Sequence, residues 1–383
     1  MDDQASVLLV SHAVKQRCGI YQFGAQLATA LQSSKRYAFS YAECSNEADY
    51  WAATARVKPA LIIYNHSPTT MPWLRRGIMR RARAAQVGVI HEVTQAVADG
   101  ADDSLFEFHI APDPTLELRN PTVFKTGRLV PDFRNDVQAP RVPTIGSFGF
   151  GTHGKGFDVL IERVQAEFDE AVIRLHIPFS DFFDAAGSSA RAIADRCRGL
   201  VTKPGVSIEL SHDFLTNEQL LGFLAGNSLN AFLYDDQPGR GISSVIDHAL
   251  AVRRPIAVSR SSMFRHLHRV EPPVTVEDAS LREILARGFA PLAPYAAAWT
   301  QAALVADYER IVDSVLATRR AAQPASAVRR IGRDVISEAD TLTREAGHRI
   351  ARSRLAEVSR GWLKRHPRVR QQWHSLRHWI ART

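Results

Sequence analysis

A lysine near the middle of the chain lies in a glycine-rich turn, where it is placed to bind a phosphate. The apolar run Thr144–Phe148 is followed by glycines at positions 149, 151, 154 and 156, and Lys155 stands just before a helix-like pattern. A glycine turn that enters a helix gathers backbone N–H groups and the positive end of the helix dipole, which suits a diphosphate. We therefore predict that Lys155 binds a phosphate; the alternative is a solvated charge at a helix start.

The N-terminal region repeats this order of strand, glycine turn and helix. Residues 6–10 are apolar, and Gly19 leads into a helix pattern over residues 20–31. We predict that Gly19 lets the backbone approach the same phosphate, and that His12 and Lys15, in the same turn region, face the cleft that holds the ligand. Two units of strand, glycine turn and helix in one chain predict two sheets that face a common ligand.

Histidine and glutamate side chains follow predicted strands in the first half. His91 and Glu92 come at the end of the run 87–91, and His66 comes shortly after the run 60–64. Open α/β sheets place ligand groups at the carboxyl ends of their strands. We predict that His91 faces the ligand; the alternative, a histidine with a structural role only, is left open.

Other motifs argue against common cofactor and metal sites. Residues 149–154 spell G-x-G-x-x-G, but their position in mid-chain and the lysine that follows favour a phosphate binder over a dinucleotide site. No Gly-Lys-Ser/Thr occurs, which argues against a P-loop NTPase. Asp235 and Asp236 follow a predicted strand, yet no second acidic pair stands at a useful spacing. We expect no cofactor and a site that works without a metal.

The elements that must position these residues alternate between apolar runs and helix-like stretches. This alternation recurs in both halves of the 383-residue chain and predicts an α/β fold with parallel sheets covered by helices. The proline-bracketed stretch 131–143 is typical of a linker. We predict a first Rossmann-like domain over residues 1–135, a second over 141–322 and a tail over 325–383.

The basic charge of the chain is concentrated in the tail. Residues 325–383 hold 14 Lys or Arg against five acids, whereas the other residues hold 34 basic and 35 acidic residues. Three of the six tryptophans also lie in the last 22 residues. Tryptophan among basic residues suits a surface of anionic lipid, so we predict a helical tail that binds a membrane. The alternative is a helix that docks on the body of the protein.

Composition restricts the location of the chain. No apolar run approaches the roughly 20 residues of a membrane span, and the acidic start lacks the features of a secretory signal. Cys18, Cys44 and Cys197 are too far apart for a disulfide framework or a zinc site. We expect a cytoplasmic protein that is peripheral on the cytoplasmic face of a membrane.

The chain resembles the retaining, family-4-like glycosyltransferases of the GT-B fold (glycosyltransferase group 1). Residues 149–162 match the start of that family's second domain around the lysine, with Lys155-Gly156-Phe157-Asp158 at the centre. Residues 239–251 match its glycine-rich turn and helix, and residues 254–259 match the strand that follows. The order and spacing agree over roughly residues 7–320. The resemblance implies two Rossmann-like domains that face a cleft.

The resemblance also implies roles for residues. The diphosphate of a nucleotide sugar would contact Gly19, Lys155 and Arg240, and the ribose hydroxyls would contact the carboxylate of Asp247. The donor-binding residues that it implies are Gly19, Lys155, Arg240, Ser243 and Asp247.

On the other side of the ligand, the family often has a His-Asp or His-Glu pair near the transferred sugar and the acceptor. The resemblance therefore places His91 with Lys155 among the catalytic residues, and Glu92 on the acceptor side. His66 lies at the equivalent edge of the preceding strand and is also predicted on the acceptor side.

Two positions depart from the family pattern. Gly239 stands where the family has a glutamate, and Phe150 stands near the position of its arginine. Arg240 or Arg265 would have to supply the missing cation. These departures leave open a non-catalytic nucleotide-sugar sensor or scaffold of the same fold.

The expected function is that of a hexosyltransferase-like, retaining glycosyltransferase of polysaccharide biosynthesis. It would move a sugar from a nucleoside-diphosphate donor to a hydroxyl of a glycan or a lipid-linked glycan. A third hypothesis, nucleic-acid binding through the Arg-rich tail, is disfavoured because the body is neutral and carries no nucleic-acid motif.

Overall fold

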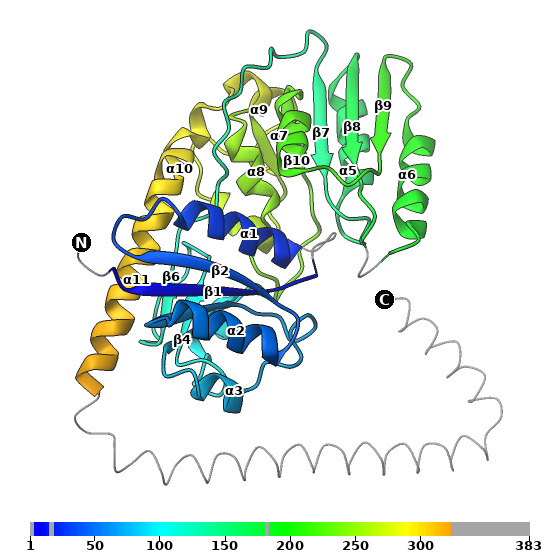
Figure 1. The fold of residues 1–383 in the computed structure, drawn as a ribbon. Helices are drawn as coiled ribbons and strands as arrows, with labels where there is room; N and C mark the ends of the chain where they lie inside the picture. Colours follow the sequence, from blue (N-terminus) through cyan, green and yellow to red (C-terminus); the bar gives the residue numbers. More distant parts are fainter. Residues whose placement is uncertain (1–3, 15–18, 181–183, 323–383) are drawn as a thin grey trace, which may run out of the picture. The chain divides into compact units, whose positions relative to one another are not determined.

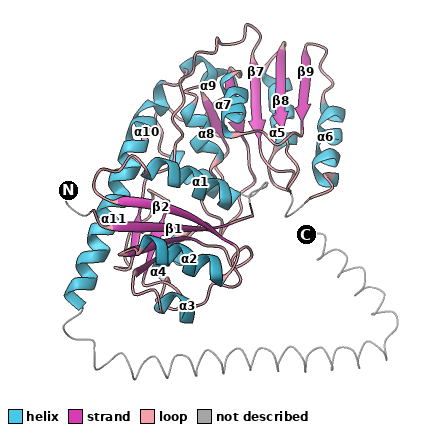
Figure 2. Cartoon of the chain, viewed as in Figure 1, coloured by secondary structure: helices cyan, strands magenta, loops and turns pink. Residues whose placement is uncertain are grey.

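The structure is a computed structural model that describes residues 4–14, 19–180 and 184–322. It has two α/β parts, each built on a parallel sheet, as Figures 1 and 2 show. This arrangement confirms the predicted fold class. Within the described ranges, no helix is both long and apolar enough to span a membrane. Lys15, Cys18 and the predicted tail at 325–383 lie outside the described residues.

The first sheet has six parallel strands in the order β2-β1-β3-β4-β5-β6. Strand β1 pairs with β2 on one side and with β3 on the other, so that Val7 lies beside both Phe39 and Leu61. The carboxyl ends of β1, β3 and β4 therefore lie next to each other. The strands are β1 (Ser6–His12), β2 (Ala38–Cys44), β3 (Leu61–Asn65), β4 (Ala85–Val89), β5 (Phe108–Ala111) and β6 (Val123–Lys125).

Helices cover both faces of this sheet because its strands are apolar on both faces. Val7 and Leu9 pack against α1 (Gly19–Leu31) and α11 (Gln301–Ala322), whereas Leu8 and Val10 pack against α2 (Glu47–Val57) and α3 (Arg76–Arg80). Successive residues of a strand point to opposite faces, which explains this division. A further short helix, α4 (Gln95–Asp99), follows β4.

The second sheet has five parallel strands in the order β11-β10-β7-β8-β9. Apolar side chains of α5, α6 and α9 share one buried cluster with the sheet, and those of α7 and α8 share another. The strands are β7 (Thr144–Phe148), β8 (Ala171–His176), β9 (Val206–Ser211), β10 (Leu229–Phe232) and β11 (Ile256–Val258). The helices are α5 (Phe157–Glu167), α6 (Ser188–Leu200), α7 (Asn217–Ala225), α8 (Val245–Ala251), η1 (Ser262–Leu267), α9 (Leu281–Arg287), η2 (Ala290–Leu292) and α10 (Ala293–Ala298).

Local signals in the sequence set several helix starts. Thr216 and Ser280 each accept a hydrogen bond from the third residue of the following helix, and that residue's side chain accepts from the cap backbone in return. Such capping boxes satisfy N–H groups that the helix itself leaves unpaired. Asn46 caps α2 in a similar way through its side chain.

The helix α11 departs from the predicted division of the chain. The sequence places residues 301–322 in the second domain, but Leu304, Tyr308 and Val312 are buried in the core of the first sheet beside Leu27 and Val87. The chain therefore returns to the first domain after completing the second. Sequence periodicity shows that a helix has an apolar face, but it does not show which of two cores covers that face.

Candidate functional site

The glycine turn after β7 has a backbone that requires glycine at position 156. Gly156 has a φ of 62° and is the residue before α5. A Cβ added there would lie 1.8 Å from the carbonyl oxygen of Leu233, so a side chain does not fit. The N-cap residue Gly156 has no side chain to cap α5, and Asp158 in the first turn accepts a hydrogen bond from the Val159 N–H at 3.1 Å. The N–H groups before Val159 remain available to an anion.

Lys155 lies at this turn without a carboxylate partner among the described residues. Its Nζ sits 4.0 Å from the centre of the Tyr234 ring, on the chain segment that follows β10. The Tyr234 hydroxyl is buried and has no hydrogen-bond partner within the described part of the protein. The turn thus brings together an ammonium group, a phenol hydroxyl and an uncapped helix start. This combination can bind a phosphate.

Three histidines meet at the carboxyl ends of neighbouring strands in the first sheet. His12 ends β1, His66 follows β3 and His91 follows β4. Burial lowers the pKa of His91 to about 4; the negative charge of Glu92 opposes this shift, and His66 and His12 add to it. Burial also lowers the pKa of His66 to about 4. Near neutral pH these two imidazoles are therefore uncharged.

The ring of His91 has a defined position and a nitrogen that the described residues leave unpaired. It packs edge-on against Phe23 of α1, with 5.4 Å between ring centres. Its Nε2 is buried and has no hydrogen-bond partner among the described residues. Because a neutral imidazole can donate or accept one hydrogen bond at each nitrogen, this atom suits a hydroxyl group.

Glu92 and Arg240 join the first domain to the second. The guanidinium of Arg240 donates to both carboxylate oxygens of Glu92, at 2.8 and 3.1 Å, and the Gly241 N–H donates to the same carboxylate at 2.9 Å. Burial tends to raise the pKa of Glu92, but the hydrogen bonds from Arg240 and Gly241 outweigh it and hold the pKa below its usual value. Arg240, predicted to bind the donor, thus has an acidic partner that was itself predicted on the acceptor side.

Asp247 forms a second and more deeply buried ion pair between the domains. Arg128, which follows β6, donates to its two carboxylate oxygens at 2.9 and 2.7 Å. The two side chains are only 7% and 5% exposed. Burial raises the pKa of the Asp247 carboxyl, and the nearby Arg128 guanidinium opposes that shift. Arg128 therefore pairs with the carboxylate that was predicted to contact a ribose.

Solved structures share this arrangement of two parallel-sheet domains. A glycosyltransferase from Rickettsia africae aligns over 82% of this chain and 99% of its own, with a TM-score of 0.57 at 10% identity. HepE from Anabaena, crystallised with UDP and glucose, aligns over 82% of this chain and 100% of its own, with a TM-score of 0.54 at 13% identity. The chain has the fold of these glycosyltransferases.

A third similar structure is the α,α-trehalose-phosphate synthase from Burkholderia xenovorans. It aligns over 81% of this chain and 99% of its own, with a TM-score of 0.52 at 10% identity. No family model and no curated protein matches the sequence. The similarity is therefore one of fold, and the predicted GT-B architecture is confirmed.

The remaining predicted donor residues lie at exposed or internally bonded positions. Gly19 is the exposed first residue of α1, and an added Cβ would meet nothing within 4 Å, so the structure does not require glycine there. Ser243 is buried, and its N–H donates to the carbonyl of Met263. Arg265 pairs with Asp113 of the first domain and donates to the carbonyl of Val93. Arg265 is thus a further interdomain contact.

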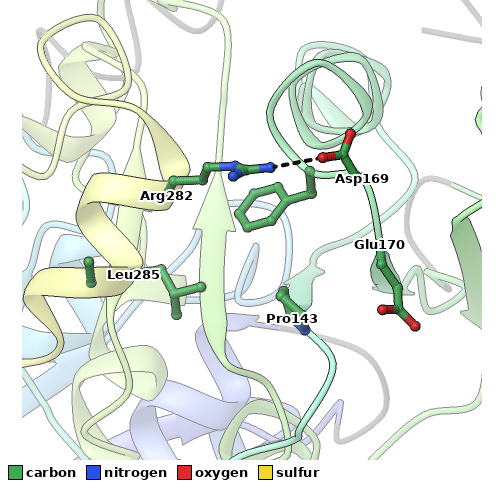
Figure 3. Close-up of a pocket in the computed structure, with 7 residues that line it drawn as sticks. Pro143, Asp169, Glu170, Arg282 and Leu285 are labelled. Carbon is green, nitrogen blue, oxygen red and sulfur yellow. Dashed lines mark ion pairs between the residues drawn. The ribbon is translucent and has the colours of Figure 1, made fainter.

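Neither the acidic pair nor the pocket in Figure 3 adds a ligand site. Asp236 accepts a hydrogen bond from the Ser262 N–H, and the described residues contain no group of three or more His, Cys, Asp or Glu placed to hold a metal. A pocket of about 390 Å³ lies in the second domain. Figure 3 shows the side chain of Arg282 pointing toward Asp169, and the two form an ion pair at 3.8 Å. None of the predicted site residues lines this pocket; the lining residues are Pro143, Phe168, Asp169, Glu170, Arg282, Leu285 and Ala286.

Sequence reasoning missed the partners of the predicted residues. Tyr234 was treated only as the end of an apolar run, although an aromatic residue with a hydroxyl at the carboxyl end of a strand is a candidate ligand group. Arg128 stands in the apolar run 123–129, where an arginine signals a buried acidic partner. Nothing in the sequence identified that partner as Asp247.

Proposed function

We propose that the chain is a retaining glycosyltransferase that moves a sugar from a nucleoside-diphosphate donor to a hydroxyl of a glycan or lipid-linked glycan. The fold supports this proposal, since the similar HepE was crystallised with UDP and with UDP-glucose. The observation that carries it is the turn at Lys155. There an ammonium without an acidic partner among the described residues lies beside an uncapped helix start, as a diphosphate requires.

The chemistry follows from the charge that develops on the leaving group. As the sugar–phosphate bond breaks, negative charge grows on the diphosphate, and Lys155 with the first turn of α5 stabilises it. The helix dipole and the lysine supply this charge stabilisation without a metal. We propose that the leaving phosphate accepts the proton of the acceptor hydroxyl on the same face of the sugar, which retains the anomeric configuration.

His91 takes a role that its neutral state allows. With a pKa lowered to about 4, it does not supply a proton as an imidazolium near neutral pH. We propose that its unpaired Nε2 positions a hydroxyl of the transferred sugar by a hydrogen bond. His66 and Glu92 lie on the acceptor side in this proposal, and Glu92 also holds Arg240 in place.

Thermal unfolding against a panel of nucleoside diphosphates and their sugars tests the donor site. A ligand at a hundredfold its dissociation constant adds about 2.7 kcal/mol to the free energy of unfolding. We therefore expect the diphosphate and the nucleotide sugars of one base to raise the melting temperature. We expect Lys155→Ala to abolish this shift. The matched control is Lys203→Ala, which removes a lysine of the same domain that is paired with Asp169. A full shift in folded Lys155→Ala contradicts the proposed donor site.

Transfer assays with the sugar nucleotide selected in this way test catalysis. Lys155→Ala should lower kcat by roughly 10²-fold or more, because it removes a stabilising charge from the transition state. Lys203→Ala should leave kcat unchanged. Equal rates for the two variants would contradict a catalytic role for Lys155.

A non-catalytic nucleotide-sugar sensor or scaffold is the second candidate. Two observations favour it: Arg240 is held by Glu92, and Asp247 is held by Arg128, so two predicted donor ligands are engaged inside the protein. A sensor would show the Lys155-dependent thermal shift but neither hydrolysis of the donor nor transfer to any glycan acceptor. Detection of a glycosylated product excludes it.

The location and further partners of the chain belong to the same proposal. We propose that it acts at the cytoplasmic face of a membrane, that residues 325–383 bind anionic lipid and that nucleic acid is not its partner. The charge of that segment supports this, with 14 basic residues against five acids. Deletion of residues 325–383 should weaken binding to anionic vesicles and leave the donor-induced thermal shift intact; unchanged vesicle binding contradicts a role of the tail.

A further inference from the structure

A second basic region lies inside the first domain, far along the chain from the tail. Residues 50–91 contain seven Lys or Arg and no acidic residue. The other residues of 1–324 hold 27 basic and 35 acidic residues. Their negative charge cancels the positive charge of this segment, so that the net charge of residues 1–324 is close to zero. A run of 42 residues without an acidic side chain is unusual for a chain with 40 acidic residues. Its positive charge favours an anionic partner.

The cationic residues of this segment gather on the two helices that cover one face of the first sheet. Side chains of α2 and of the chain around α3 share a single buried cluster with Leu8 and Ile62 of the sheet. Figure 1 shows α2 and α3 together on the side of the sheet opposite α1. Arg81, just after α3, also forms an ion pair with Glu47 at the start of α2. We call the outer side of these two helices, with the residues that flank them, the α2–α3 surface; its basic residues are Arg56, Lys58, Arg75, Arg76, Arg80, Arg81 and Arg83.

Most of this charge is not neutralised within the described part of the protein. Arg56, Lys58, Arg75 and Arg83 are exposed, and none of them has an acidic partner among the described residues. Arg76 pairs with Asp103, whose side chain is 77% exposed, so that pair is weak. The helix α2 also carries Glu47 and Asp49 in its first turn, so seven basic residues against these two acids leave the α2–α3 surface with an excess of positive charge.

Two tryptophans lie within the same surface. Trp51 of α2 and Trp73, which precedes α3, are half-buried and both contact the ring of Tyr50, at 5.1 and 6.1 Å between centres. Trp51 Nε1 donates to the Glu47 carboxylate at 3.0 Å, whereas Trp73 Nε1 is buried and has no partner among the described residues. The exposed part of these side chains can therefore add apolar contact at a bilayer interface, where tryptophan is enriched.

We propose that the α2–α3 surface docks the first domain onto a bilayer that contains anionic lipid. The four exposed cations without an acidic partner among the described residues, Arg56, Lys58, Arg75 and Arg83, supply the electrostatic attraction, and the part-exposed side chains of Trp51 and Trp73 add apolar contact. Single-stranded nucleic acid is bound with bases stacked on open aromatic faces, and these two rings are instead packed against Tyr50. The observations thus favour lipid over nucleic acid.

Docking there would orient the acceptor side of the proposed enzyme. The chain passes from Asn65 at the end of β3 through His66 and reaches Arg75 and α3 within a short loop. One loop therefore joins His66, which is predicted on the acceptor side, to the α2–α3 surface. A lipid-linked acceptor held in the bilayer would meet the protein on this domain. The docking proposal itself does not depend on the glycosyltransferase assignment.

Co-sedimentation of the full chain with vesicles tests this surface. Vesicles of phosphatidylcholine alone are compared with vesicles that also contain phosphatidylglycerol, for wild type and for Arg75→Glu/Arg83→Glu. Each surface cation contributes roughly a factor of five to partitioning, so this variant should bind the anionic vesicles about 25-fold less well or weaker. The matched control is Arg141→Glu/Arg269→Glu, which makes the same charge change at exposed arginines of the second domain and should bind almost as wild type.

Two results overturn the proposal. If Arg75→Glu/Arg83→Glu binds anionic vesicles as tightly as the control variant, the α2–α3 surface is not a lipid-binding surface and the tail alone accounts for binding. If that variant loses binding to a labelled DNA or RNA oligonucleotide but not to vesicles, the surface serves nucleic acid. Equal melting temperatures of the two variants, with the same nucleotide-induced shift, confirm that the first domain is folded in both. A difference that appears only with anionic vesicles supports lipid docking.

Discussion

At the scale of residues, the protein keeps its strand-end histidines neutral by burying them. His66 and His91 both have pKa values lowered to about 4 by burial, and His176 in the second domain has the same value for the same reason. The neutral state suits hydrogen bonding to hydroxyl groups and excludes an ion pair with a phosphate. Lys155, in contrast, remains the cation of the site.

This neutrality predicts how stability depends on pH. Between about pH 6.5 and about pH 4 the unfolded chain binds protons on these histidines that the folded chain does not, so the free energy of unfolding falls as pH falls. One such histidine contributes up to about 1.4 kcal/mol per pH unit. We expect His91→Gln to lose less stability than wild type between about pH 7 and pH 5 in urea unfolding. Replacement of exposed His153 by glutamine should leave the slope unchanged; an unaltered slope in His91→Gln contradicts the assignment.

At the scale of elements, the proposed phosphate site is a strand, a turn and a helix joined by one obligatory glycine. The φ of 62° at Gly156 turns the chain from Lys155 into α5, and the carbonyl of Leu233 closes the space where a side chain would stand. The same packing brings Tyr234 to Lys155. The turn therefore fixes the cation and the helix start in one geometry.

Replacing Gly156 by alanine should disrupt this turn. The added methyl would meet the Leu233 carbonyl and a left-handed backbone, which together cost at least ~2 kcal/mol in the free energy of unfolding. The matched control is Gly222→Ala in the exposed part of α7, where nothing lies within 4 Å of the added atom. That variant should gain about 0.5–1 kcal/mol from helix propensity. Denaturant unfolding measures both, and equal effects would argue against a sterically closed turn.

At the scale of the whole molecule, ion pairs and a shared helix connect the two sheets. Arg128–Asp247, Arg265–Asp113 and Arg240–Glu92 each link a residue of one domain to a residue of the other. The helix α11 adds apolar contacts by returning to the first core. The first of these pairs is the most deeply buried, so it should matter most for stability.

Breaking the Arg128–Asp247 pair should destabilise the protein strongly. Asp247→Leu leaves a buried guanidinium without its partner, which costs about 3–5 kcal/mol in the free energy of unfolding. Removing both charges in Arg128→Met/Asp247→Leu should restore most of that loss. As a control, Asp136→Ala breaks the exposed pair with Arg134 and should cost less than about 1 kcal/mol. If Asp247→Leu has no larger effect than Asp136→Ala in denaturant unfolding, the buried pair is not an important contact.

The sequence by itself determined the elements and the glycine turn around Lys155. Apolar runs with alternating helix patterns located the strands, and the glycine spacing around Lys155 located the turn, because both depend on neighbouring residues only. The local signals thus gave the α/β fold class.

Only the tertiary structure decided which long-range partners meet. Asp247 is paired with Arg128 from a distant strand end, Glu92 is paired with Arg240, and α11 is buried in the first domain instead of the second. The basic residues of α2 and α3 form one surface only because both helices pack on the same face of the sheet. Contacts between residues far apart in the chain depend on how cores are closed, and a single sequence carries no local signal for that choice.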